Sequence, residues 1–317
     1  MAFRNHIPGN GTGGSICRRG SLPPALTALF LAGLLQITSG CAAARLTQFH
    51  NFAQAGTAYT KASQAVLDEA GTAAIEADSL IAQKGRDGLR TPDERRQFIV
   101  GENQELRKRL MLLGDIGRHA RLLQSYFETL AALADPKAPA TLGTAAQGVF
   151  DSIGGLSPAI KSASLGGVKI GDHIPQATSF AVQVFKAKAL ENELKARSKA
   201  IERELALQEA AFTVITSTLE TDLAVQLQLE ETEEVIEPFA AAKDLPKGWA
   251  VHREEILRAR VAAASSKAAQ EATAKLRESF VALVENRLSE PSIAGIITAI
   301  NSMLNSTEAI KKATPTQ

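Results

Sequence analysis

A stretch of 62 residues without glycine or proline, from Gln176 to Glu237, is the feature that most constrains how this chain can fold. Large apolar residues recur along it about every 3.6 positions, at Leu194, Ile201, Leu205, Phe212, Ile215 and Leu219. That period is typical of the buried face of an α-helix. An uninterrupted helix of this length would extend for about 90 Å, so the pattern predicts an elongated molecule.

Three other segments, residues 44–83, 91–134 and 250–288, show similar helical spacing. The second should begin sharply, because Thr91, Pro92 and Glu94 supply a capping hydroxyl, a proline in the first turn and the acid of a capping box. A last helix after residue 292 places Ile293, Ile296, Ile297, Ile300 and Leu304 on one face. This face is a candidate docking surface, although we expect it to be buried in the bundle.

Residues 138–175 differ in composition from the helical segments on either side. They contain seven glycines and three prolines, and Asp151 is the only charged residue between positions 138 and 160. We expect short helices broken by glycine, for example over residues 142–153, in an insert that caps one end of the bundle.

Together these patterns predict an all-α fold. We expect an elongated, antiparallel and coiled-coil-like bundle, with the Gly-rich insert between its second and third long helices. The alanines of residues 259–274 are small enough to let a neighbouring helix approach closely.

The first 40 residues have the three parts of a secretory signal. Arg18 and Arg19 precede an uncharged stretch from Leu22 to Ile37, which small residues follow. The apolar core of about 16 residues is shorter than the roughly 20 that a stable membrane span needs.

The sequence Ile37-Thr38-Ser39-Gly40-Cys41 resembles the lipobox of bacterial lipoproteins, with Thr38 where leucine is commoner. The resemblance implies that Cys41 is acylated and becomes the first residue of the mature protein. Residues 1–40 would then be the signal peptide, and residues 41–317 one elongated helical domain. Ala42, where aspartate would indicate inner-membrane retention, favours the periplasmic face of the outer membrane of a Gram-negative bacterium. The alternatives are a soluble periplasmic protein and a transmembrane anchor.

The charge balance excludes some classes of function. Residues 41–317 contain 32 Lys and Arg against 34 Asp and Glu, and aromatic residues make up 5% of the chain. Nucleic-acid binding needs a basic surface and often stacking aromatics, so we expect no nucleic acid as a partner. After cleavage Cys41 would be the only cysteine, which leaves no intrachain disulfide.

No pattern of catalytic or metal-binding residues stands out. Four histidines, at positions 50, 119, 173 and 252, are scattered through the expected mature chain. Asp115 and His119 have i,i+4 spacing but lack a third ligand, so we expect a solvated ion pair there. The glycines of residues 166–171 lack the strand and helix of a phosphate loop. The acidic run of residues 230–237 suggests a solvated helix end that frays or pairs with Lys243 or Lys247.

These observations favour a non-enzymatic, lipid-anchored scaffold of the cell envelope that needs no cofactor. Its expected partners are the membrane, through Cys41, and either other envelope proteins or further copies of the chain. The alternative is a membrane-active protein that inserts residues 138–175. In layout it resembles the helical pore-forming toxins of the cytolysin A type, although Asp151, Lys161, Lys169 and Asp172 would be costly in lipid.

Overall fold

The computed structural model describes residues 24–135, 137, 139, 141–183, 187–241, 244–263 and 267–313, with the side chains of these residues from 44 onward except 261–263 and 313. It divides into two compact units, Met1–Ala43 and Ala44–Gln317. Every described core residue belongs to the second unit, which therefore has a hydrophobic core of its own. The division between the units falls two residues beyond Cys41.

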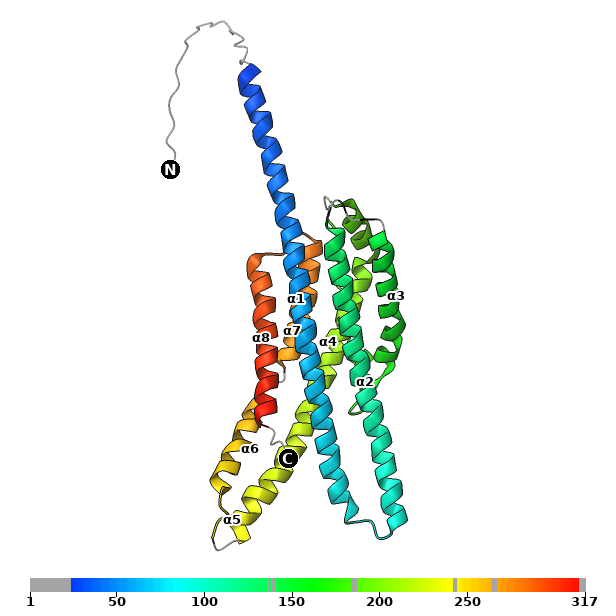
Figure 1. The fold of residues 1–317 in the computed structure, drawn as a ribbon, viewed down its shortest axis with the longest axis vertical. Helices are drawn as coiled ribbons and strands as arrows, with labels where there is room; N and C mark the ends of the chain where they lie inside the picture. Colours follow the sequence, from blue (N-terminus) through cyan, green and yellow to red (C-terminus); the bar gives the residue numbers. More distant parts are fainter. Residues whose placement is uncertain are drawn as a thin grey trace, which may run out of the picture. The chain divides into compact units, whose positions relative to one another are not determined.

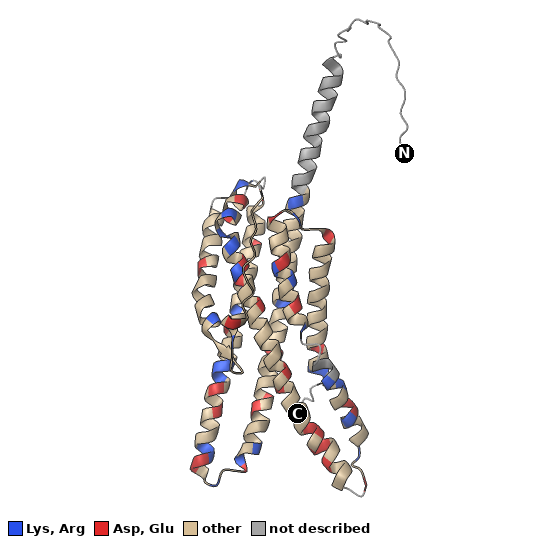
Figure 2. Cartoon of the chain, turned by 180° about the vertical axis from the view of Figure 1, so that it is seen from behind, with Lys and Arg blue, Asp and Glu red and all other residues tan. Residues whose placement is uncertain are grey.

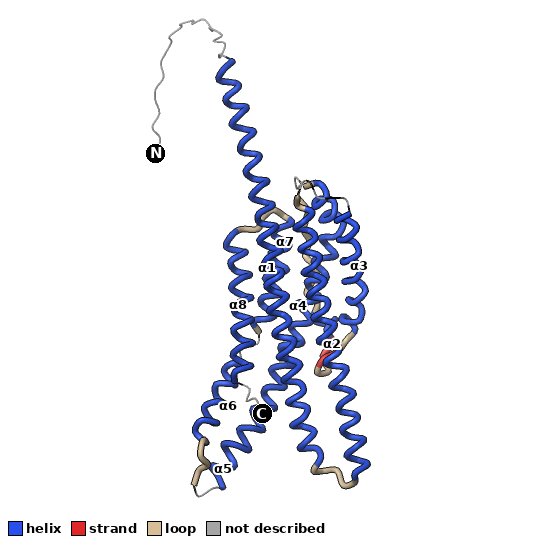
Figure 3. The backbone as a smooth tube through the Cα atoms, viewed as in Figure 1, coloured by secondary structure: helices blue, strands red, loops and turns tan. Residues whose placement is uncertain are grey.

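The described elements confirm an all-α helical bundle (Figure 1). In chain order they are α1 (Pro24–Arg86), α2 (Pro92–Leu133), α3 (Thr141–Ser162), β1 (Ser164–Leu165), β2 (Val168–Lys169), the 3₁₀-helix η1 (Ile170–His173), α4 (Lys188–Glu230), the π-helix η2 (Glu231–Ile236), α5 (Glu237–Ala241), α6 (Trp249–Ala263), α7 (Ala268–Val284) and α8 (Glu290–Ala313). The two strands form a small antiparallel hairpin, drawn in red in Figure 3.

Aromatic side chains join α1, α2 and α7 at the centre of the second unit. The ring of Phe52 meets Phe127 edge-on with centroids 5.2 Å apart, and Phe280 lies 6.0 Å from Phe52 and 5.8 Å from Phe127. All three side chains are fully buried. Such pairs stabilise a core beyond the area that they bury, so this cluster holds three helices together.

The capping box of α2 is confirmed. The Glu94 amide donates to Thr91 Oγ1 at 3.2 Å, and the Thr91 amide donates to Glu94 Oε2 at 2.9 Å. These backbone hydrogen bonds lower the pKa of the Glu94 carboxyl. The start of this helix is local in origin, and for that reason it could be predicted from four consecutive residues.

The prediction of one helix from Gln176 to Glu237 was wrong at its beginning, because residues 174–183 are not helical and α4 starts at Lys188. Paired residues show that α3 and α4 run in the same direction: Ser157 contacts Glu204, and Gly166 lies against Thr218. The chain must therefore return along α3, which is about 33 Å long at 1.5 Å per residue. Ten extended residues span about that distance, whereas ten helical residues would span less than half of it.

Tertiary contacts hold this return segment in place. Phe180 is buried in the core, the Thr178 amide donates to Glu202 Oε1 at 3.4 Å, and the Gln183 amide donates to the Val284 carbonyl at 3.1 Å. These contacts replace the hydrogen bonds that a helix would have made.

The Gly-rich insert is also different from the prediction. Its first part is a single helix of 22 residues, α3, which lies along α2 rather than capping an end of the bundle (Figure 1). Ala146, Ile153 and Ile160 form its buried face. The four glycines of α3 have open space where a side chain would be, so they neither break the helix nor mediate a close contact.

The predicted helix over residues 250–288 is divided. α6 ends at Ala263 and α7 begins at Ala268, and residues 264–266 lie outside the described part of the chain. Both helices pack against α4 and α8, and α6 also packs against η2. In α8, Ile293, Ile296 and Ile300 are buried as expected, whereas Leu304 is partly buried and Ile297 is exposed.

Replacing Ile153 by alanine tests the packing of α3. Its side chain is fully buried, so we expect Ile153→Ala to lower the free energy of unfolding by about 3 kcal/mol through lost burial and a cavity. Ile297→Ala is the matched control at an exposed position, with an expected change within about 0.5 kcal/mol. Urea unfolding followed by circular dichroism measures both, and equal midpoints for the two variants would show that α3 does not pack as described.

Candidate functional site

The predicted lipidation site, Cys41, lies within α1. Its side chain is outside the described part of the structure, so acylation and cleavage stay predictions. Among the residues that could be searched, no helix combines the length and the apolar character needed to cross a bilayer.

His119 does not pair with Asp115, contrary to the expected solvated ion pair. Asp115 pairs with Arg118, whereas His119 is fully buried. The His119 Nε2 atom lies 3.1 Å from Glu204 Oε2, and its Nδ1 atom lies 2.7 Å from the Gln208 amide nitrogen. In the described residues no group of three or more His, Cys, Asp or Glu side chains is placed to hold a metal ion.

A hydroxyl joins this cluster, but its order is not that of a hydrolase. Ser157 Oγ donates to Glu204 Oε2 at 2.5 Å, so the carboxylate lies between the hydroxyl and His119. A serine nucleophile needs the base in direct contact with its own hydroxyl. Burial alone would raise the pKa of Glu204, but the hydrogen bonds from His119 and Ser157 outweigh burial and lower it. The cluster ties α2, α3 and α4 together.

The other residues singled out by their sequence lie apart from one another. His50, His173 and His252 are exposed. Gly166 and Gly167 form the turn of the strand hairpin, with φ angles of +56° and +80° that favour glycine. Neither glycine precedes the first turn of an α-helix, as a phosphate-binding loop would require.

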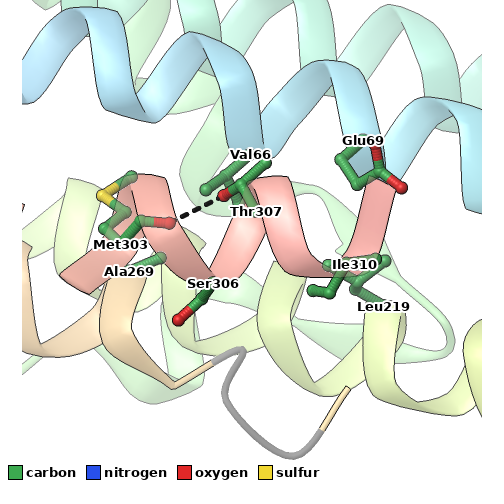
Figure 4. A pocket seen from close by; sticks show the side chains of 8 residues that line it. All are labelled: Val66, Glu69, Leu219, Ala269, Met303, Ser306, Thr307 and Ile310. Atoms are coloured by element: carbon green, nitrogen blue, oxygen red, sulfur yellow. Dashed lines mark hydrogen bonds between the residues drawn. The ribbon is translucent and has the colours of Figure 1, made fainter. Parts of the chain in front are cut away.

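A small cavity among α1, α4, α7 and α8 has room for about one water molecule, about 10 Å³ (Figure 4). Its lining is mostly apolar, and the Thr307 hydroxyl beside it donates to the Met303 carbonyl at 2.8 Å. Glu69 lies at its edge with 7% of its surface exposed. The cavity is too small for an organic ligand, so we interpret it as a small gap in the packing of the four helices.

The feature that stands out lies at the end of the bundle where α1 gives way to α2. We define the α1–α2 arm as residues 75–112 and the α4–α6 arm as residues 223–260. The salt bridges Lys84–Glu233 and Arg109–Asp222 connect the first arm with the end of α4 and with η2. Both arms therefore extend from the same end of the second unit (Figure 1).

The α4–α6 arm has a small core separate from that of the bundle. Leu227, Val235, Ile256 and Ala259 form it, and Trp249 packs against it. The indole Nε1 atom of Trp249 donates to the Val235 carbonyl at 2.9 Å. This separate core allows the arm to keep its shape beyond the end of the main core.

The helical path does not end at Glu237 as predicted, because it continues through Pro238 to Ala241. The preceding residues form a π-helix in which the Glu237 amide donates to the Thr232 carbonyl, five residues back. Proline has no N–H to donate and its ring clashes with the carbonyl four residues earlier. The wider π-helical turn accommodates both effects, and π-helical turns are frequent at functional sites.

Large apolar side chains are uncovered on the α4–α6 arm. Phe239 is 63% exposed and stacks on Trp249 with ring centroids 5.5 Å apart. Ile236, Leu245 and Val251 are also exposed. Large apolar side chains exposed close together are typical of interaction sites.

The α1–α2 arm is uncovered in the same way. Between residues 78 and 112 the described structure has no buried residue. Ile99, Val100 and Met111 are among its exposed apolar side chains. Since a two-helix hairpin cannot bury both of its faces, this arm presents surface that a partner could cover.

A groove of about 540 Å³ lies at the base of the α1–α2 arm, bordered by the strand hairpin and Asp222. Ala74, Ala77 and Leu106 are among its apolar lining residues, and both partners of the Arg109–Asp222 salt bridge line it as well. The acidic run is only partly solvated: Glu231 pairs with Arg260 and Glu233 with Lys84. Lys247 forms no salt bridge with a described residue, and Lys243 lies outside the described part of the chain.

Comparison with known proteins adds no relative: no family model matches the chain, and no curated protein and no solved structure matches it either. The fold defines the class, an all-α helical bundle, and the two arms are its candidate binding site.

Sequence reasoning missed these arms as a unit. Their signals were present but weak: Val100 and Met111 depart from the apolar stripe of α2, and Phe239 follows Pro238 at the end of the acidic run. Ile99 lies in phase with that stripe, two heptads before Leu113, so its spacing predicts burial, but it is 40% exposed. Only the tertiary structure shows that no neighbouring helix covers these residues.

The pH dependence of stability can be tested at Glu69. Burial, and then repulsion from Glu76, raise the pKa of Glu69 despite the attraction of Lys311. A carboxyl whose folded-state pKa is raised destabilises the fold increasingly as pH rises through that pKa. We expect Glu69→Gln to have a higher Tm than wild type at pH 7, and the difference to shrink toward pH 4.

The control for this prediction is Glu278→Gln, at an exposed position. It should show no pH-dependent gain in Tm. A Glu69→Gln Tm at or below that of wild type at pH 7 would contradict the prediction, and thermal unfolding followed by circular dichroism at both pH values provides the measurement.

Proposed function

We propose that this protein is a lipid-anchored, non-enzymatic scaffold of the cell envelope that presents a binding end at a distance from the membrane. The observation that carries the proposal is the pair of uncovered arms at the end of the second unit farthest from residue 44. The lipobox-like sequence ending at Cys41 supports the anchor, and Ala42 supports the outer membrane.

The length of α1 gives the distance. From Ala44 to Arg86 the helix extends for about 65 Å at 1.5 Å per residue. Cys41 is three residues from Ala44, so a lipid on its sulfur would hold one end of this helix at a membrane. The arms would then lie several tens of ångströms from the bilayer surface, within reach of other envelope proteins.

The chemistry of the arms supports binding to protein. Aromatic and large aliphatic side chains such as Phe239 and Val100 contribute strongly to protein–protein interfaces. A helical bundle with its own core can hold them in place without a ligand.

The anchor is tested by Cys41→Ser. We expect this variant to leave the membrane fraction and to lack the mass of the acyl groups, because no other described feature replaces the lipid. Cys17→Ser is the matched control: it changes the other cysteine, within the leader, and should stay membrane-bound. Fractionation with intact mass spectrometry measures both variants, and a Cys41→Ser protein that remains lipidated would refute the anchor.

The binding end is tested separately with a photo-crosslinking amino acid placed at Val100 or Phe239 in cells. Ser152, exposed on α3, serves as the control position. We expect discrete adducts of defined mass from the two arm positions and none from Ser152. Equal adducts from all three positions, or none from the arms, would contradict a binding role for this end.

A further inference from the structure

The two arms carry charges of opposite sign. Residues 75–112 contain eight Lys and Arg against seven Asp and Glu, a formal net charge of +1. Residues 223–260 contain five Lys and Arg against eight Asp and Glu, a net charge of −3. Figure 2 shows acidic positions following one another along the end of α4. The α1–α2 arm and the α4–α6 arm therefore differ in the sign of their net charge.

The salt bridges between these elements follow the same pattern. In both Lys84–Glu233 and Arg109–Asp222 the base comes from the α1–α2 arm and the acid from α4 or η2. The surfaces of the two arms are thus complementary within one chain, and these two contacts use only part of their charge.

Several charges on the arms have no ion-pair partner among the described residues. They are Arg86, Arg90 and Arg107 on the α1–α2 arm, and Glu234 and Glu237 on the α4–α6 arm. Exposed apolar residues lie on each arm as well, Ile99 and Val100 on the first, Ile236 and Phe239 on the second. A partner with acidic residues facing the α1–α2 arm and basic residues facing the α4–α6 arm would pair with these charges and cover the apolar side chains of both arms.

We propose that this partner is a second copy of the same chain. A two-fold axis makes an interface self-complementary, because each patch of one copy meets the other patch of its partner. The basic α1–α2 arm of one copy would lie against the acidic α4–α6 arm of the other, twice in the dimer. The uncovered apolar side chains of both arms are covered in that arrangement. This inference rests on the proposed function in that the arms are the binding end, and it does not depend on the lipid.

The test uses residues 41–317 with Cys41→Ser, which contain the whole described core. Light scattering after size exclusion and analytical ultracentrifugation should show a dimer at low ionic strength. The dimer should weaken as salt rises, because exposed charges are screened within about 10 Å at 0.1 M salt. A monomer at all protein concentrations up to about 100 µM in low salt would overturn the proposal.

Charge reversal makes the test specific. The variant Arg86→Glu with Arg90→Glu makes both arms acidic, and the variant Glu234→Arg with Glu237→Arg makes both arms basic. We expect each variant alone to be monomeric, since every contact then joins like charges. An equimolar mixture should form a heterodimer, because each arm of one variant again meets the opposite charge. Monomers alone with no heterodimer on mixing, or unchanged dimers in either variant, would refute the arm-to-arm arrangement.

The chain carrying all four reversals provides the rescue control. Its arms have exchanged sign, so it should form a homodimer again, which a merely misfolded variant could not do. Trp249, the only tryptophan, lies in the α4–α6 arm, and its emission should shift with dimer formation. A monomeric chain that still gives arm-specific crosslinks to another envelope protein would overturn the dimer and leave the proposed function standing.

Discussion

The register of the bundle depends on polar side chains that α4 buries and pairs with its neighbours. Carboxylates and an amide of α4 meet α2 and α7 at separate levels, in the contacts Glu193–Tyr126, Gln208–His119 and Glu202–Arg277–Glu209. An unpaired buried charge costs several kcal/mol, whereas sliding one alanine or leucine stripe along another costs little. A shift in register would separate these pairs and leave buried charges without a partner. The aromatic cluster then adds stability to an arrangement that polar pairing has selected.

Beyond the level of Leu219 this network ends, and the character of the molecule changes. The bundle no longer covers α1 and α2, and α4 continues into an arm with a small core of its own. Elements with few buried contacts open locally at low cost and are available for binding. The π-helix before Pro238 and the stacked ring of Phe239 belong to this part. The same chain thus combines a packed body, whose buried carboxylates are paired, with an end on which many apolar and charged side chains are exposed.

Features encoded by neighbouring residues were predictable. The capping box at Thr91 and the apolar period of α4 depend on contacts within a few residues, so both could be recognised without a structure. The start of α4 and the environment of His119 were not predictable in this way. The non-helical residues 174–183 have no glycine to mark them, and the path of α3 obliges them to span a distance that a helix could not. His119 finds Glu204 and Gln208 across 85 and 89 residues of chain.

The order of residues was enough to establish an all-α helical bundle, because helical period and composition act within each segment. It also marks Cys41 as the expected lipidation site, since the lipobox pattern is local. The arms as a binding end emerged only from the tertiary structure. Whether Ile99 or Phe239 is covered depends on which helices reach that level of the bundle, and this follows from how far the paired core of α4 extends. Whether a side chain is exposed depends on helices that are distant in the sequence. The apolar period of a single segment therefore does not reveal it.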